Sequence, residues 1–326
     1  MAASFYSQAA ANRRNSFVLV VVIVALLAAL GAAIGYGTTG AVEGTIGWLG
    51  IFGIVAIASS LLGYFSGDQV VLAASRARPA SEAEAGQLFN VVRELTLAAG
   101  IPMPKVYLIE DTALNAFATG RDPAHASIAV TTGLLERLDR EELQGVIGHE
   151  LSHVRNYDIR YAMLVGVLVG TVALVADVFL RMTFWGGFGR RSSSNERGGG
   201  GGLQALIFVL AIVLAILAPF FARLVQLAVS RQREYLADAS SVELTRNPYG
   251  LERALATIAD DTEVLEVANR ATQHLYFRNP IRRFEERSKG LFSTHPPIVE
   301  RINRLRTLTG EAPIGTAGLP GARSAD

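Results

Sequence analysis

The sequence predicts a mainly α-helical membrane protein with four transmembrane helices and a polar α+β domain that contains a small β-sheet. Half of the 326 residues are hydrophobic, the mean hydropathy is +0.32, and the apolar residues gather in four long segments. A helix about 20 residues long crosses a hydrocarbon core of about 30 Å. The four segments are Phe17–Tyr36, Thr45–Phe65, Tyr161–Leu180, with Asp177 as its one charge, and Leu203–Phe221.

These segments divide the chain into six parts. A polar N-terminal tail at 1–16 precedes a transmembrane hairpin at 17–66, and a second hairpin at 161–222 contains a Gly- and Ser-rich loop at 186–202 that we expect to be flexible. The polar domain is split into 67–160 and 223–310. Residues 311–326 are rich in Gly, Ala and Pro, a composition typical of a disordered tail. For the third and fourth segments, buried core helices are the alternative interpretation.

Basic residues predict the orientation in the membrane. Arg13 and Arg14 precede the first hairpin, Arg76 and Arg78 follow it, and its connecting loop has no Lys or Arg. This pattern places both ends of the hairpin, and the polar domain with them, in the cytoplasm. The second hairpin gives a conflicting signal, so partial insertion or packing on the protein stays open for it. Its basic residues, which would face outward, are Arg181, Arg190, Arg191 and Arg197.

Within residues 67–160 the pattern predicts two helices and a small sheet, and residues 223–310 have a polar, helical pattern. Ser81–Ala99 reads as a helix, while Lys105–Glu110 and Ser127–Thr132 read as strands. Between them, the short apolar stretch of residues 115–120 has the character of an edge strand. Asp139 and Glu142 form a capping-box pattern at the start of the second helix. An apolar stripe at helical spacing then continues through Leu143, Val146, Ile147, Leu151 and Val154.

That second helix carries the most informative motif, Gly148-His149-Glu150-Leu151-Ser152-His153. Residues four apart lie on one face of a helix, so His149 and His153 can bind one zinc ion while Glu150 reaches a water on the same metal. Two ordinary half-buried histidines are the alternative. Gly145 and Gly148 are costly inside a helix, and close approach of another backbone would explain them.

Composition limits the other classes of function. A net charge of +1 argues against a nucleic-acid partner. The chain has no Cys, so it has no disulfides and any zinc site must use His and carboxylates.

Two histidines leave a catalytic zinc site incomplete, because such sites usually have three protein ligands. His125, His274, His295 and many carboxylates are candidates for the third. Glu234 and Asp238 stand out because they lie four apart on a probable helix, so one can bind zinc while the other orients a ligand histidine. On spacing alone, a solvated helix face explains them equally well.

The combined motifs resemble those of the HtpX-type membrane zinc metalloproteases, relatives of the CAAX prenyl proteases. The resemblance covers nearly the whole chain, and four apolar segments favour the bacterial HtpX branch. It is carried by His-Glu-Leu-Ser-His at 149–153, Ser-Arg-Gln-Arg-Glu-Tyr-Leu-Ala-Asp at 230–238, Asn-Ala-Phe-Ala at 115–118 and Ser-Thr-His-Pro-Pro at 293–297.

The resemblance implies a zincin-like metalloprotease domain with one Zn²⁺ per chain, bound by His149, His153 and Glu234. Glu150 is then the general base, Asp238 the partner that orients a ligand, and His295 a group near the zinc that stabilises the oxyanion. Arg231 would steady the site electrostatically, although a surface Arg is equally expected. The edge strand would bind substrate by strand addition through Asn115, Ala116, Phe117 and Ala118.

The implied role is quality control of misfolded or damaged membrane proteins during stress, in the bacterial inner membrane. Partners are then polypeptides and the lipid bilayer. Three rivals remain at this stage: a membrane-bound chaperone with a degenerate site, a selective processing enzyme of the CAAX type, and a transporter. The polar domain that carries the motifs makes a transporter remote.

Overall fold

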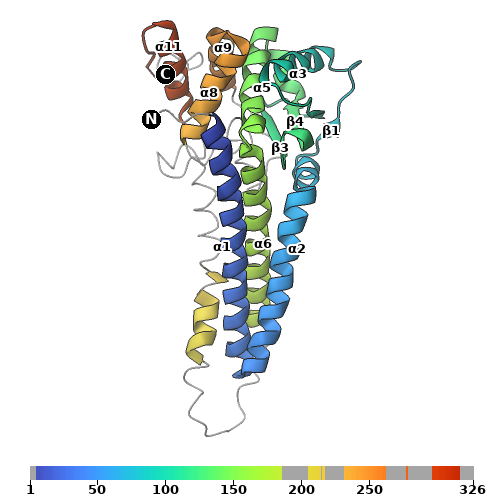
Figure 1. The fold of residues 1–326 in the computed structure, drawn as a ribbon, viewed down its shortest axis with the longest axis vertical. Coiled ribbons are helices and arrows are strands. Elements are labelled where there is room, and N and C mark those ends of the chain that lie inside the picture. Colours follow the sequence, from blue (N-terminus) through green and yellow to red (C-terminus); the bar gives the residue numbers. More distant parts are fainter. Residues whose placement is uncertain are drawn as a thin grey trace. The chain divides into compact units, whose positions relative to one another are not determined.

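The computed structural model describes residues 5–185, 205–213, 215–216, 231–261, 277 and 296–315 (Figure 1). The chain forms two compact units, each built from separate stretches of sequence. The polar unit comprises Met1–Arg13, Ser66–Met163 and Leu227–Asp326, and the helical unit comprises Arg14–Phe65 and Leu164–Gln226.

Three long helices supply most of the helical unit. They are α1 (Phe5–Thr39), α2 (Val42–Ala74) and α6 (Asp158–Trp185). Each contains a stretch long and apolar enough to cross a membrane: Ala10–Thr39, Val42–Ala74 and Asp158–Arg181. The first three predicted segments lie inside these stretches. The fourth stays a prediction, because only residues 205–213 and 215–216 of it are described, as helix.

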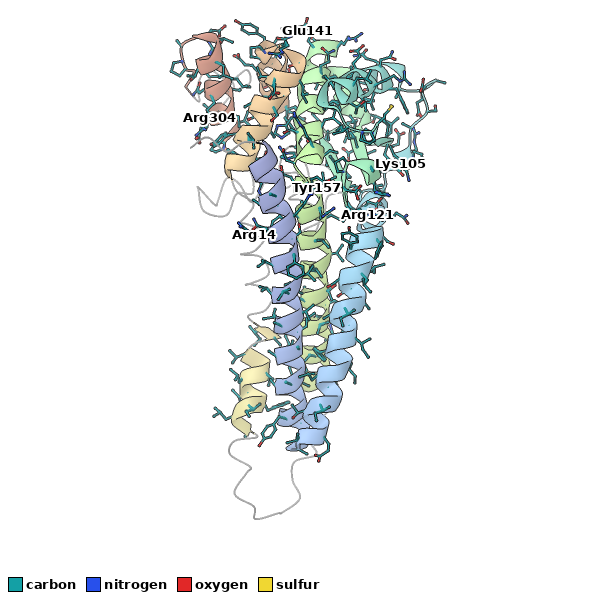
Figure 2. All side chains as sticks on the ribbon, viewed as in Figure 1. Arg14, Lys105, Arg121, Glu141, Tyr157 and Arg304 are labelled. Atoms are coloured by element: carbon teal, nitrogen blue, oxygen red, sulfur yellow. The ribbon has the colours of Figure 1, made fainter. Side chains whose placement is uncertain are left out.

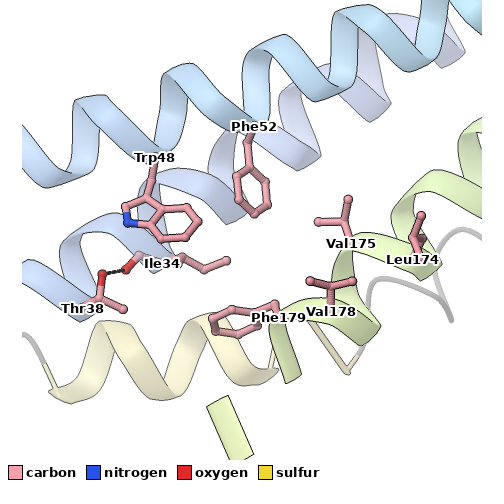
Figure 3. Close-up of a pocket in the computed structure, with 8 residues that line it drawn as sticks. All are labelled: Ile34, Thr38, Trp48, Phe52, Leu174, Val175, Val178 and Phe179. Carbon is pink, nitrogen blue, oxygen red and sulfur yellow. Dashed lines mark hydrogen bonds between the residues drawn. The ribbon is translucent and has the colours of Figure 1, made fainter. Parts of the chain in front are cut away.

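A cavity of about 240 Å³ lies among α1, α2 and α6 within the helical unit (Figure 3). Its one hydroxyl belongs to Thr38, whose Oγ1 donates to the Ile34 carbonyl at 2.7 Å and is thereby satisfied within its own helix. The described lining residues are otherwise mainly hydrophobic, and none of them has an acidic or basic side chain. They are Ile34, Thr38, Trp48, Phe52, Leu174, Val175, Val178 and Phe179.

The polar unit contains a mixed four-stranded sheet with the order β1-β2-β4-β3. Its strands are β1 (Arg78–Pro79), β2 (Lys105–Ile109), β3 (Ala116–Gly120) and β4 (Ala126–Thr131). β2 and β4 pair in parallel, and the other two pairs are antiparallel. The predicted strands are confirmed to within one residue at each end, and β3 is the edge strand that the sequence indicated.

Helices pack around this sheet, with α5 (Arg140–Arg155) in contact with most of them. The apolar stripe of α5 is fully buried, as predicted. Its neighbours are α3 (Gly86–Ala99), α8 (Arg231–Thr245) and α9 (Pro248–Asp260), and α11 (Ile298–Thr309) packs on α8 and α9. A short α4 (Thr132–Arg137) links β4 to α5, and a single 3₁₀ turn, Pro123–His125, precedes β4.

Two predicted boundaries differ from the structure. α3 begins at Gly86 rather than Ser81, because residues 82–84 form a turn. Residues 5–16, expected as a polar tail, form the first turns of α1. The predicted loop at 186–202 lies outside the described residues, and only 311–315 of the predicted disordered tail are described, without helix or strand.

Candidate metal centre and active site

Local sequence determines where α5 begins. The Asp139 side chain accepts the Glu142 amide at 2.9 Å, and the Glu142 carboxylate accepts the Asp139 amide at 3.0 Å. The predicted capping box is therefore confirmed. It satisfies two backbone donors that the start of a helix leaves unpaired.

The two glycines of α5 allow neighbouring helices to approach closely. A Cβ on Gly145 would lie 2.6 Å from the Leu251 backbone in α9, and one on Gly148 would lie 2.8 Å from Ser241 Oγ in α8. Ser241 Oγ also donates to the Gly145 carbonyl at 2.6 Å. The expected close approach is confirmed. It brings α8, which carries Glu234, against the face of α5 that carries the histidines.

His149, His153 and Glu234 converge at one point. The two Nε2 atoms are 3.2 Å apart, and each lies 3.7 Å from one carboxylate oxygen of Glu234. Two ligand atoms bound to one tetrahedral zinc at 2.0–2.1 Å are separated by roughly 3.3 Å. The three side chains therefore fit a single metal ion without rearrangement, and the ligand atoms of the group all lie within 4.8 Å of one another.

Asp238 contacts the His149 ring at Nδ1, and Arg301 binds Asp238. Asp238 Oδ1 lies 2.9 Å from His149 Nδ1, so the ring donates its Nδ1 proton there and its Nε2 lone pair faces Glu234. Arg301, only 1% exposed, grips the same carboxylate through Nε at 2.9 Å and Nη2 at 2.6 Å. Burial, followed by the positive charge of Arg301, lowers the pKa of His149 to about 4.

Asp158 holds His153 in a similar manner. Its Oδ2 lies 3.0 Å from His153 Nδ1, which again leaves Nε2 directed at the common point. Burial alone would lower the pKa of His153, but the hydrogen bond with Asp158 and the negative charges of Glu234, Asp158 and Glu150 outweigh it. They raise the pKa to about 9.

The electrostatics of the group also suit a cation. Glu150, Glu234, Asp158 and Asp238 are all buried beside the histidines, and Arg301 compensates only part of that charge. The same excess of negative charge that raises the pKa of His153 would favour a divalent ion, whose binding would require the imidazole to be neutral. Glu150, 2% exposed, follows His149 directly on α5.

Other candidates from the sequence fall elsewhere. His125 is exposed and its Nδ1 lies 2.7 Å from Asp122, so it is not part of the group. His274, His295 and the side chain of Arg231 lie outside the described residues.

The candidate substrate strand lies at the sheet edge, next to α5. The Asn115 carbonyl accepts the Thr131 amide of β4, whereas the Ala116 carbonyl faces away from β4 and accepts the Phe277 amide at 2.8 Å. Because backbone groups alternate along a strand, those of Ala118 also face the outer edge. The structure thus identifies the outward-facing residues, which sequence alone left open.

Sequence reasoning missed three residues of this region: Asp158, Phe277 and Arg301. The Arg301 guanidinium lies 4.7 Å from the centre of the Phe277 ring, which in turn packs edge-on against His149. Only Asp158 had a local signal, as a carboxylate five residues after His153. Arg301 is 152 residues from His149 and no spacing rule connects them.

The model of peptidase family M48 matches residues 82–309, well over half of the chain. The chain belongs to this peptidase family. Together with the long apolar helices and the His149–His153–Glu234 group, membership identifies a membrane-associated metalloprotease.

Similar proteins include three called protease HtpX homolog, which confirms the resemblance found in the sequence. The one from Streptococcus agalactiae serotype III (strain NEM316) is 46% identical over 301 residues, covering 92% of this chain and 99% of the relative. That from Thermoanaerobacter pseudethanolicus is 42% identical over 311 residues, with 94% and 98% covered. That from Listeria monocytogenes serotype 4a is 42% identical over 306 residues, with 93% and 99% covered.

Proposed function

We propose that this protein is a zinc endopeptidase of the bacterial inner membrane that degrades misfolded or damaged membrane proteins. The observation that carries the proposal is the convergence of two imidazole Nε2 atoms and one carboxylate within 3.2–3.7 Å of one another. Two His and one Glu form the ligand set of a gluzincin-like catalytic zinc, which leaves one position for water.

The chemistry that zinc supplies at such a site is polarisation of the scissile carbonyl and activation of water near neutral pH. The protein's own groups complete the reaction. Glu150 takes the proton of the attacking water and delivers it to the leaving amine. His295 stabilises the oxyanion, and Arg231 contributes positive charge near Glu234; both roles rest on the resemblance to the family.

Replacing Glu150 with Gln tests the mechanism. The variant should lose hydrolysis of labelled casein while it keeps one zinc per chain, because Glu150 is a base and not a ligand. Glu136→Gln, the same change at an exposed position on α4, is the matched control and should retain both properties. Near-wild-type turnover by Glu150→Gln would refute the proposed mechanism.

The substrate class can be identified with the same variant. Cells that express Glu150→Gln should accumulate membrane proteins that cells with the wild-type enzyme degrade, as quantitative proteomics would show. Accumulation restricted to one or two processed precursors would instead favour a selective processing enzyme.

We also propose that substrate adds as a strand to the outer edge of β3. The outward-facing backbone of Ala118 supports this, because main-chain pairing gives affinity with little dependence on sequence. Ala118→Pro removes an outward N–H and should raise KM for casein, whereas Ala118→Gly keeps the N–H and should not. Equal KM values for the two variants would remove the case for strand addition.

The active site is proposed to face the cytoplasm. The absence of native Cys allows single cysteines at Ser81, Ser194 and Ser288 to be probed on intact cells with an impermeant thiol reagent. Ser81→Cys and Ser288→Cys should remain unlabelled. Labelling of Ser194→Cys alone would establish that the second hairpin spans, and labelling of either of the others would overturn the topology.

A further inference from the structure

A buried asparagine in the first turns of α1, the part of that helix that belongs to the polar unit, contacts residues distant in the sequence. Asn12 is only 1% exposed. Its Nδ2 donates to the Asn156 carbonyl at 2.9 Å and to Asp158 Oδ1 at 2.6 Å, and its Oδ1 accepts from Arg233 Nη1 at 3.4 Å. Both ends of the amide are therefore used, each toward a different part of the chain.

Two of these three partners, Asp158 and Arg233, lie next to proposed metal ligands. Asp158 Oδ1 binds Asn12, while its Oδ2 binds His153 Nδ1 at 3.0 Å. Arg233 directly precedes Glu234 on α8, and its guanidinium also lies 3.7 Å from Asp158. Asn12 thus connects the segment that orients one proposed ligand with the first turn of the helix that carries another.

The next residue, Arg13, contacts Tyr157, which lies between Asn156 and Asp158. Its guanidinium lies 4.1 Å from the centre of the Tyr157 ring, at the turn between α5 and α6 where Figure 2 labels Tyr157. Tyr157 has φ of 60°, in the left-handed region that a bulky residue adopts only when its surroundings enforce it.

That turn decides where Asp158 lies. In an uninterrupted helix, residues five apart point about 140° away from each other, so Asp158 would not reach His153. The turn at Tyr157 breaks the helix and brings the carboxylate back to the ring. Asn12 and Arg13 contact the three residues of this turn, Asn156, Tyr157 and Asp158.

We propose that the first turns of α1, ahead of the apolar stretch that begins at Phe17, help to position a metal ligand of the active site. Asn12 is a positioning residue: its Nδ2 binds Asp158, which in turn contacts His153 Nδ1, and it thereby fixes the orientation of one of the three ligands. Loss of the contact between Asn12 and Asp158 would then weaken metal binding. The inference rests on the proposed function in one respect, the identity of the bound metal.

Zinc affinity of the full-length protein in detergent tests the inference, measured by competition with a fluorescent chelator. Asn12→Ala should weaken binding by about 3- to 10-fold, less than the roughly 10–100-fold typical when a direct partner of a ligand is lost. Asn15→Ala, the same change at an exposed position one turn along α1, should leave affinity unchanged.

A double-mutant cycle with Asp158→Asn separates positioning from general destabilisation. If Asn12 acts through Asp158, the double variant should bind zinc little more weakly than Asp158→Asn alone. The casein activity of Asn12→Ala should fall at limiting zinc and recover at saturating zinc, with KM unchanged. A merely structural role would not produce this recovery.

Wild-type affinity in Asn12→Ala, or additive losses in the cycle, would overturn the inference. If Asn12→Ala does not accumulate as a folded protein, Asn12→Leu provides the same comparison, because it keeps much of the side-chain volume and the charge but removes the Nδ2 donor. A wild-type protein that binds zinc without cleaving casein would refute the proposed function and leave this inference standing.

Discussion

The two histidines of the motif lie one helical turn apart, yet the carboxylates that contact their Nδ1 atoms have different surroundings. Behind His149, a carboxylate is neutralised by a buried guanidinium, with the Phe277 ring packed against both His149 and Arg301. Behind His153, the described partners of the Asp158 carboxylate besides that ring are the neutral amide of Asn12 and, farther away at 3.7 Å, the guanidinium of Arg233. The His149 side chain is 1% exposed and that of His153 is 16% exposed.

This difference explains why one motif contains histidines of opposite charge preference. Burial and Arg301 lower the pKa of His149 to about 4, whereas Asp158 and the carboxylates of Glu234 and Glu150 raise that of His153 to about 9. Helical spacing places the two Nε2 atoms side by side. The charge that each ring favours is set by its surroundings: burial and the distant Arg301 for His149, and the nearby Asp158 and Glu150 together with the distant Glu234 for His153.

The largest expected effect comes from removing Glu234, the carboxylate that lies beside both histidines. Glu234→Ala should leave far less than one zinc per chain after dialysis, because two imidazoles alone do not complete the site. Metal analysis by mass spectrometry measures this, with Glu243→Ala, an exposed position on the same helix, as the control. Full zinc retention would exclude Glu234 as a ligand and redirect the search to His274 or His295.

A smaller effect should appear when only the His149 side is altered. Arg301→Met leaves the Asp238 carboxylate buried without its cation, which typically costs about 3–5 kcal/mol of stability. A clear fall in melting temperature in detergent is expected, while Arg304→Met, on the same helix with its side chain 57% exposed, should stay near wild type. Equal melting temperatures for the two variants would show that the Arg301–Asp238 pair does not stabilise the fold.

The smallest effect should come from the His153 side. Asp158→Asn removes the negative charge behind His153 and should weaken zinc binding by about 10–100-fold, with little change in melting temperature. Asp260→Asn, at an exposed position on α9, is the control in the same chelator competition. A larger loss of stability than in Arg301→Met would reverse the contrast between the two sides.

Local sequence was sufficient for much of this architecture. The capping box at Asp139 and Glu142, the apolar stripe of α5 and the strands β2, β3 and β4 are encoded by residues within a few positions of one another, and the structure confirms them. The two-residue strand β1 was not predicted. Gly145 and Gly148 correctly indicated close helix packing. The expectation that Glu234 and Asp238 share a face is met, and both lie at the histidines.

The remaining parts depend on contacts between distant segments. Asp158 reaches His153 only through the left-handed turn at Tyr157, which no local pattern announces, and Asn12 is 146 residues from Asp158. Arg301 lies in an amphipathic helix where an arginine would ordinarily face solvent. Such long-range pairs leave no periodic signal in a single sequence.

The order of the site's parts along the chain has a consequence for synthesis. Asp238 follows His149 by 89 residues, and Arg301 follows it by 152. At about 5–20 residues per second, the ribosome needs roughly 4–18 seconds to supply Asp238 after His149, and longer to supply Arg301. For that interval the nascent chain carries both histidines and Glu150 without the groups that complete the centre. The His149–His153–Glu234 group and its partners Asp238 and Arg301 can therefore come together only after residue 301 has been synthesised.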